Sequence, residues 1–262
     1  MSNSPLVSYT KISPNRTKNR NHVIDTITIH CVVGQVTVER LGEIFANPLR
    51  RASSNYGIGS DGRIGMYCEE NDRSWCSSNK ANDHRAITIE VASDAAHPYR
   101  VNDAAFESLI YLCADICERN GIKKLVWSNY KAERVNHLCG CNMTVHRDFA
   151  NKSCPGEYLY SRHGEIAERV NAILDGKEEI KGEVARNPYP VPTRTLKRTY
   201  PTMKGEDVKW LQTELNAVVY NLEVDGKFGT KTLAAVKDYQ KKHGLVVDGK
   251  VGSATRKALL EN

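Results

Sequence analysis

Residues 23–33 read VIDTITIHCVV, and apolar and polar side chains alternate along this stretch. Isoleucine and cysteine occupy one face, whereas Thr26, Thr28 and His30 occupy the other. Alternation with a period of two is typical of a β-strand that buries one face and keeps the other polar. We therefore predict a strand here whose polar face presents the imidazole of His30.

A second stretch repeats this pattern. Residues 86–92 read AITIEVA, with isoleucine and valine on one face and Thr88 and Glu90 on the other. If the two strands belong to one sheet, His30 and Glu90 can project into the same cleft. Taken singly, each has a plainer interpretation, His30 as a structural histidine at a strand end and Glu90 as a surface carboxylate.

Helical patterns alternate with these strands, because apolar residues recur there at intervals of three and four. Strands that alternate with helices argue for an α/β domain built on one central sheet. Residues 130–145 fit neither pattern. The further predicted elements are helices over residues 37–46, 104–120 and 157–174, a hairpin over residues 52–65 and a short strand over residues 125–128.

The last third of the chain has a different character. Residues 176–198 are first highly charged and then rich in proline, which predicts a linker stiffened by polyproline II structure. Beyond it, VDGKFGTKT begins at Val224 and VDGKVGSAT begins at Val247, a repeat spaced by twenty-three residues. We predict a small three-helix bundle over residues 199–262, following a larger domain over residues 1–175.

Charge and hydropathy restrict the partners and the location of the protein. The net charge is +6, and residues from Lys177 onward hold sixteen Lys and Arg against eleven Asp and Glu, which favours an anionic surface for the tail. We expect no nucleic acid partner. No apolar run approaches the roughly 20 residues that cross a bilayer, and the N-terminal residues lack the apolar core of a secretion signal. We therefore expect no transmembrane segment, and synthesis and retention in the cytoplasm unless something else releases the protein.

All eight cysteines precede residue 155. Without a secretion signal, free thiols or metal ligands are more frequent than disulfides. In HRDFANKSCPG (residues 146–156), seven residues separate His146 from Cys154, which suits a folded-back loop that offers two metal ligands. His30 would complete a His₂Cys set, the three-ligand form of a zinc site with an open fourth position. HLCGC (residues 137–141) is a weaker metal candidate, because a fourth ligand is missing.

Amide or ester hydrolysis at a zinc ion needs a group that moves protons and a donor to the oxyanion. Proton transfer requires a carboxylate that does not bind the metal, and Glu90, which is outside the predicted ligand set, suits this role. Lys152, two residues before Cys154, is a candidate oxyanion donor. Tyr56, in the small-residue stretch SSNYGIG, is a second candidate.

Four motifs occur in order along residues 22–175, namely ITIH, YGIGSDGRI, ITIEVA and HRDFANKSCPG. Together they resemble the zinc-dependent N-acetylmuramoyl-L-alanine amidases, a family of phage endolysins, bacterial autolysins and animal peptidoglycan-recognition proteins. The resemblance implies a central mixed β-sheet flanked by helices. It also implies hydrolysis of the amide between the lactyl group of N-acetylmuramic acid and the L-alanine of the stem peptide.

The resemblance also implies roles for particular residues. Glu90 and Lys152 match catalytic positions of the family. Tyr56 lies where many members carry a histidine followed by an aromatic residue, and branches differ in whether tyrosine or glutamate transfers the proton, so Tyr56 and Glu90 both stay candidates. The residues that match the Zn²⁺ ligands of the family are His30, His146 and Cys154.

The tail resembles the small peptidoglycan-binding domains of cell-wall hydrolases, through GEDVKWLQTEL (residues 205–215) and the two Asp-Gly repeats. The resemblance therefore implies bacterial peptidoglycan as the partner, and action on the cell wall after holin-type release or lysis, or after secretion by a non-Sec route. Two alternatives differ in class, a peptidoglycan receptor that does not cut and a zinc peptidase that cuts within the stem peptide. The retained Cys154 favours an enzyme, since a family member without this ligand binds without cutting. The oligomeric state and the choice between endolysin and autolysin stay open.

Overall fold

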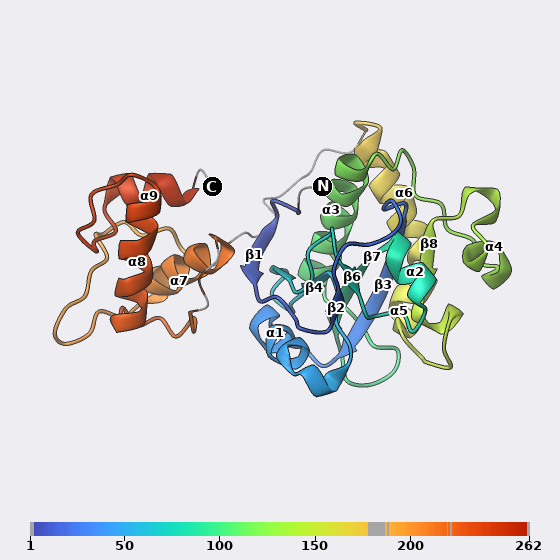
Figure 1. The fold of residues 1–262 in the computed structure, drawn as a ribbon, viewed down its shortest axis with the longest axis horizontal. Coiled ribbons are helices and arrows are strands. Elements are labelled where there is room, and N and C mark those ends of the chain that lie inside the picture. The colour runs from blue at the N-terminus through green and yellow to red at the C-terminus, as the bar shows by residue number, and fades with distance from the viewer. Residues whose placement is uncertain (1–2, 178–186, 188, 219, 221, 261–262) are drawn as a thin grey trace. The chain divides into compact units, whose positions relative to one another are not determined.

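The computed structural model describes residues 3–177, 187, 189–218, 220 and 222–260. These residues form two compact units, and the division falls between Lys177 and Asn187 (Figure 1). Each unit has a hydrophobic core of its own.

The larger unit is built on one mixed β-sheet. Its strands are β1 (Val7–Thr10), β3 (Thr26–Val33), β4 (Tyr56–Ile58), β5 (Ile64–Met66), β7 (Ala86–Ser93) and β8 (Met143–Val145), and a separate small sheet pairs β2 (Arg16–Thr17) with β6 (Arg73–Ser74). The six strands lie in the order β1-β5-β4-β7-β3-β8. β3 is parallel to β7 and β8, and β4 is parallel to β7 but antiparallel to β5. The predicted central mixed sheet and the predicted hairpin are confirmed.

Two long helices, α3 (Asp103–Asn120) and α6 (His163–Leu174), pack together and share a core with the apolar face of the sheet (Figure 1). Ile27, Ile29 and Ile87 of the central strands are fully buried in this core. The shorter helices are α1 (Val38–Ala46), α2 (Lys80–Arg85), α4 (Lys131–Val135) and α5 (Gly156–Ser161), with single turns η1 (Pro48–Arg50), η2 (Leu138–Gly140) and η3 (His146–Asp148). Among the described residues, no helix combines the length and the apolarity needed to cross a bilayer.

Hydroxyl groups line the opposite face of the central strands. Thr28 Oγ1 and Thr144 Oγ1 lie 2.8 Å apart, and each hydrogen-bonds to the side-chain amide of Asn82. On β7, Thr88 Oγ1 hydrogen-bonds to Ser74 Oγ at 2.7 Å. Because all these groups are buried, a slip in register would leave polar atoms without partners, at a cost of about 1–3 kcal/mol each. These contacts therefore hold β3 and β8 in register and join β7 to β6 on the face that carries the candidate site.

Two sequence predictions differ from the structure. Residues 125–128 do not form a strand, because the side-chain amide of Asn171 bonds to both the N–H and the carbonyl of Leu125 and takes the place of a neighbouring strand. The helix predicted over residues 157–174 is divided into α5 and α6 at Arg162.

The smaller unit consists of α7 (Glu206–Val218), α8 (Thr230–Lys242) and α9 (Ser253–Leu260), which confirms the predicted bundle. The two Asp-Gly repeats form equivalent turns, each clamped by a buried glutamine. Gln212 accepts the N–H of Gly226 and donates to Asp225, and Gln240 makes the same two bonds to the second turn. The glycine of each turn has a left-handed backbone, with φ of 71° and 70°, which explains why the repeat keeps glycine there.

Part of the predicted linker packs on this bundle. Leu196 is fully buried in the smaller core and bridges to Val251, and Asn187 donates a hydrogen bond to the carbonyl of Trp210. Residues 178–186 and 188 of the predicted linker lie outside the described residues. The end of the proline-rich segment therefore belongs to the smaller unit.

Candidate metal centre

The register of the central strands brings two of the predicted site residues together. His30 of β3 lies directly opposite Glu90 of β7, one pleat beyond the pair Thr28 and Thr88. Both side chains therefore point to the polar face of the sheet. His30 is fully buried there, and Glu90 is partly exposed at the cleft.

The remaining ligand candidates, His146 and Cys154, lie in the loop that follows β8. His146 begins η3 immediately after this strand, and the N–H of Arg147 donates to the carbonyl of Cys154, which closes the loop back on itself. Ligand atoms of His30, His146 and Cys154 all lie within 4.8 Å of one another. The structure thus assembles the His₂Cys set from residues that are far apart in the sequence.

The geometry of this set fits zinc. His30 Nδ1 and Cys154 Sγ are 3.5 Å apart. Zinc bonds of about 2.0–2.1 Å to nitrogen and 2.3 Å to sulfur, at a tetrahedral angle, separate the two ligand atoms by about 3.5 Å. Burial, with a smaller contribution from His146, lowers the pKa of His30 to about 3, so the ring is neutral at neutral pH, which is the form that binds metals.

Further groups hold two of the three ligands, His146 and Cys154, in place. Ser78 Oγ lies 2.9 Å from His146 Nε2, and the N–H of Cys31 donates to Cys154 Sγ at 3.4 Å. A hydrogen bond on one imidazole nitrogen leaves the other for a metal, and an N–H donor stabilises a thiolate. Ser78 belongs to the polar loop between β6 and α2, and no sequence signal marked it.

Glu90 occupies an unusual electrostatic environment. Burial, followed by the nearby Cys31 thiol, raises the pKa of Glu90 to about 8 in the metal-free protein. Its Oε2 atom is buried without a hydrogen-bond partner, and its Oε1 atom lies 3.9 Å from Cys76 Sγ. A divalent cation beside Glu90 would favour the ionised carboxylate and lower this pKa. The site therefore contains a carboxyl group that can hold or release a proton near neutral pH.

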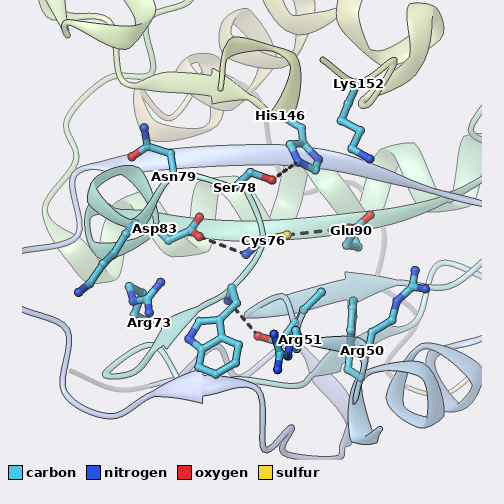
Figure 2. A pocket seen from close by; sticks show the side chains of 15 residues that line it. Arg50, Arg51, Arg73, Cys76, Ser78, Asn79, Asp83, Glu90, His146 and Lys152 are labelled. Atoms are coloured by element: carbon cyan, nitrogen blue, oxygen red, sulfur yellow. Dashed lines mark hydrogen bonds between the residues drawn. The ribbon is translucent and has the colours of Figure 1, made fainter. Parts of the chain in front are cut away.

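A cleft of about 540 Å³ opens over Glu90 and His146 (Figure 2). Its walls are strongly basic. Among the described residues, none of the five lining cations makes an ion pair with a carboxylate. These cations are Arg50, Arg51, Arg73, Lys80 and Lys152.

Lys152 is an exposed residue that lines this cleft with His146, and burial, followed by the charge of Lys152, lowers the pKa of that histidine. The structure thus brings Lys152 to the same cleft as Glu90 (Figure 2). An ammonium group in this position can stabilise an anion that develops over the metal site.

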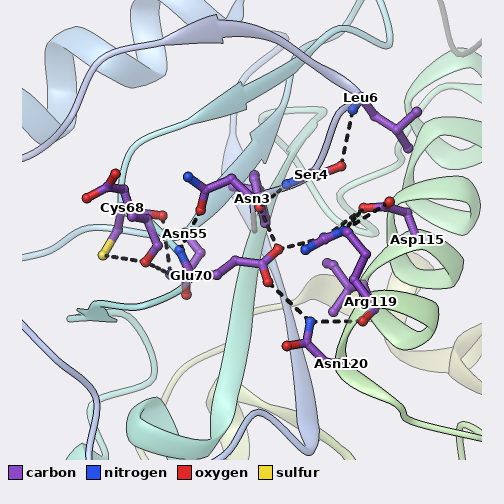
Figure 3. A network of polar contacts seen from close by, with 12 residues as sticks. Asn3, Ser4, Leu6, Asn55, Cys68, Glu70, Asp115, Arg119 and Asn120 are labelled. Carbon is purple, nitrogen blue, oxygen red and sulfur yellow. Dashed lines mark hydrogen bonds and ion pairs between the residues drawn. The ribbon is translucent and has the colours of Figure 1, made fainter. Parts of the chain in front are cut away.

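The structure does not bring Tyr56 to this cleft, contrary to the sequence prediction. Tyr56 pairs with Ile89 of β7, so its side chain points to the face of the sheet opposite Glu90. There it is fully buried, and its hydroxyl donates to Glu70 Oε1 at 2.6 Å and accepts the N–H of Ser4. Glu70 also binds Arg119 in this network (Figure 3). Tyr56 is therefore committed to the core.

A buried ion pair braces the His146 turn. Arg134 and Asp148 are 2% and 4% exposed, and Arg134 Nε and Nη2 donate to the two oxygens of Asp148 at 3.0 and 2.6 Å. Asp148 also accepts the N–H of Val145 at the start of the turn, and the Arg134 guanidinium lies over the ring of Trp127. The pair therefore fixes the backbone that carries His146.

Replacing Arg134 by methionine should destabilise the larger unit by about 3–5 kcal/mol, because it leaves the Asp148 carboxylate buried without a countercharge. The free energy of unfolding of the full chain, from urea denaturation followed by circular dichroism, measures the effect. Arg40→Met is the matched control, since the exposed pair of Arg40 with Glu43 is worth at most about 1 kcal/mol. Equal losses in both variants would contradict the bracing role of Arg134.

The HLCGC segment does not assemble a comparable site. Its cysteines are free, and the ring of His137 hydrogen-bonds to the carbonyl of Cys141. Within the described part of the chain, the groups of histidine, cysteine and carboxylate side chains close enough to share a metal all include His30. The two groups are His30 with His146 and Cys154, and His30 with Cys76 and Glu90.

Comparisons with known proteins match the larger and the smaller unit of the chain to two different families. The family model of N-acetylmuramoyl-L-alanine amidases matches residues 19–157, and a family of peptidoglycan binding domains matches residues 204–259. The N-acetylmuramoyl-L-alanine amidase CwlL of Bacillus licheniformis is 28% identical over 208 residues, which cover 76% of this chain and 51% of that protein. The amidase CwlH of Bacillus subtilis is 28% identical over 128 residues, 45% of this chain and 48% of that protein.

The chain spans about half the length of the curated relatives it matches. Among solved structures, the N-acetylmuramoyl-L-alanine amidase LysC from Clostridium intestinale is similar with a TM-score of 0.42 and 19% identity, over 58% of this chain and 89% of that one.

Proposed function

Because the chain belongs to the N-acetylmuramoyl-L-alanine amidase family, we propose that it hydrolyses the amide bond between N-acetylmuramic acid and the L-alanine of the peptidoglycan stem peptide. The observation that carries the proposal is the convergence of His30, His146 and Cys154 close to Glu90, with Glu90 and His146 lining an open cleft. This arrangement combines a three-ligand metal site with a proton-transfer group, the parts that a zinc amide hydrolase needs.

We assign the steps to this chain's own residues. His30, His146 and Cys154 would hold the zinc ion, which when bound would acidify the attacking water and polarise the scissile carbonyl. Glu90 takes the proton of the water and delivers it to the leaving amine of L-alanine. The ammonium group of Lys152 stabilises negative charge on the carbonyl oxygen. Tyr56 has no part in these steps.

The basic walls of the cleft suit an acidic substrate. Stem peptides end in a carboxylate, and a cleft lined by charges of one sign raises the local concentration of oppositely charged ligands. We propose that Arg50 and Arg51, which are exposed at the cleft and have no carboxylate partner among the described residues, attract the peptide part of the substrate.

Reversing both charges with Arg50→Glu and Arg51→Glu should raise KM for a soluble muramyl peptide about tenfold, within the range of electrostatic steering, and change kcat little. The rate of the parent protein should also fall more steeply with added salt than the rate of this variant. Steady-state kinetics at two ionic strengths measure both effects. Arg40→Glu, a charge reversal on α1 outside the cleft lining, is the control, and an equal rise in KM there would contradict a role for the cleft charges.

We propose a catalytic domain over residues 1–175 and a wall-binding domain that begins within residues 176–198 and continues to residue 262. The match of residues 204–259 to a peptidoglycan binding domain family supports this division. The second domain would keep the enzyme on bacterial peptidoglycan, where the protein acts after release from the cell, as an endolysin or an autolysin.

Mass spectrometry of the products from purified cell walls tests the proposed reaction. An amidase leaves glycan strands with free lactyl carboxyl groups and releases stem peptides that begin with L-alanine. Shortened peptides on intact muramic acid would instead identify a peptidase. Binding to the walls without any product from zinc-loaded protein would identify a receptor that does not cut.

A further inference from the structure

Cys76 lies at the floor of the cleft without a role in the proposed reaction. It follows β6 at the start of the loop that leads to α2, and its N–H donates to the Asp83 carboxylate at 3.1 Å. Its sulfur lies 3.9 Å from Glu90 Oε1, and Cys76 is one of the residues that line the cleft (Figure 2).

Cys76, Glu90 and His30 form a second group of metal-binding side chains. One ligand atom from each of the three lies within 4.8 Å of the other two. Two polar atoms of this group are buried without a hydrogen-bond partner in the described residues, Oε2 of Glu90 and Nε2 of the fully buried His30. Buried polar atoms without a partner are rare, and an ion that is not present in the structure is one explanation for them.

The three donors have a definite metal preference. A thiolate, a carboxylate and an imidazole together suit zinc or cadmium, whereas magnesium and calcium prefer oxygen donors alone. His30 offers its Nδ1 atom on the side of Cys154 Sγ, at 3.5 Å, and its other ring nitrogen has no hydrogen-bond partner in the described residues. One imidazole can therefore serve both groups.

We propose that Cys76 and Glu90, with His30 as the shared ligand, form a second cation position that takes zinc or cadmium when the ion is in excess. Binding of the second ion displaces two protons to solvent, that of the Cys76 thiol and the remaining ring N–H proton of His30, and ties the Glu90 carboxylate to the ion. If Glu90 moves protons as in the proposed function, on which this consequence rests, excess zinc inhibits the enzyme. The metal position itself does not depend on that function.

Native mass spectrometry of the full chain, titrated with zinc, counts the bound ions. The parent protein should bind a second zinc ion after the first. Cys76→Ser should bind the first ion normally and the second at least about 100-fold more weakly, since even the loss of an outer partner of a metal ligand costs 10–100-fold. Cys139→Ser, which removes an exposed thiol elsewhere, is the matched control and should bind two ions.

Measuring the hydrolysis rate of the same variants provides a second test. Each protein is compared with its own rate at one equivalent of zinc, so that differences in basal rate cancel. Excess zinc should lower the rate of the parent protein and of Cys139→Ser, but not that of Cys76→Ser. If Cys76→Ser is not folded by circular dichroism, Cys76→Ala replaces it.

Two results would overturn the proposal. One is a parent protein that never holds more than one ion, and the other is a Cys76 variant that binds the second ion as tightly as the parent does. A protein that binds two ions but releases no stem peptide would leave the second position intact and contradict the proposed function instead.

Discussion

Replacing Glu90 by glutamine should lower the rate of stem-peptide release by about a thousandfold, within the range of 10²–10⁴ that a positioned general acid–base group contributes. The change removes one ionisable oxygen and keeps the size of the side chain. Because Glu90 is not one of the three converging residues His30, His146 and Cys154, the variant should still bind one zinc ion. The loss should appear in kcat, since the carboxylate acts on the proton in the reaction and not on the affinity for the wall.

Release of stem peptides from purified walls and the zinc content of the dialysed protein are measured together. Glu43→Gln removes an exposed carboxylate of α1 that pairs with Arg40, and it should retain full activity. A Glu90→Gln variant with full activity would refute the assignment of Glu90. A variant that has lost its zinc would place Glu90 among the metal ligands.

Replacing Cys154 by serine should remove both zinc and hydrolysis, because a hydroxyl group is a poor substitute for a thiolate ligand. The two remaining ligands, His30 and His146, would hold the ion much more weakly. The activity loss should match or exceed that of Glu90→Gln, since metal-dependent hydrolysis cannot proceed without the bound zinc ion. Wall binding by the C-terminal domain should persist, because this domain contains no cysteine.

Zinc content and a sedimentation assay with purified walls separate these effects. Cys139→Ser, at an exposed position in η2, is the control and should keep zinc, activity and wall binding. Retention of one tightly bound zinc ion in Cys154→Ser would exclude Cys154 as a required ligand. Loss of wall binding together with activity would indicate a folding defect, which circular dichroism detects.

Local sequence patterns predict much of the fold because they report on short-range constraints. The alternation in β3 and β7 fixes which side chains share a face within each strand, so His30 and Glu90 are placed on polar faces from the sequence alone. The HRDFANKSCPG stretch places His146 and Cys154 eight positions apart, and the bond from the Arg147 N–H to the Cys154 carbonyl closes the loop that brings them together. The repeat in the tail predicts its turns, because each copy carries the glycine that a left-handed backbone requires.

Tyr56 illustrates where local patterns fail. β4 has only three residues, and all of them are buried, so no alternation of polar and apolar residues identifies the face of its tyrosine. The face follows from pairing with Ile89 of the neighbouring strand, a contact between segments 33 residues apart in the sequence. The strand predicted over residues 125–128 is wrong for a similar reason. The side chain of Asn171, which is distant in the sequence, makes hydrogen bonds to the backbone N–H and carbonyl of Leu125.

The sequence by itself determined the two polar strand faces, the ligand loop and the division into a larger α/β part and a helical tail. Only the tertiary structure decided that β3 and β7 are neighbours with His30 opposite Glu90, and that Cys76 lies beside that carboxylate. The physical reason is that periodicity acts along one strand, whereas register between strands depends on hydrogen bonds and packing among residues distant in the chain.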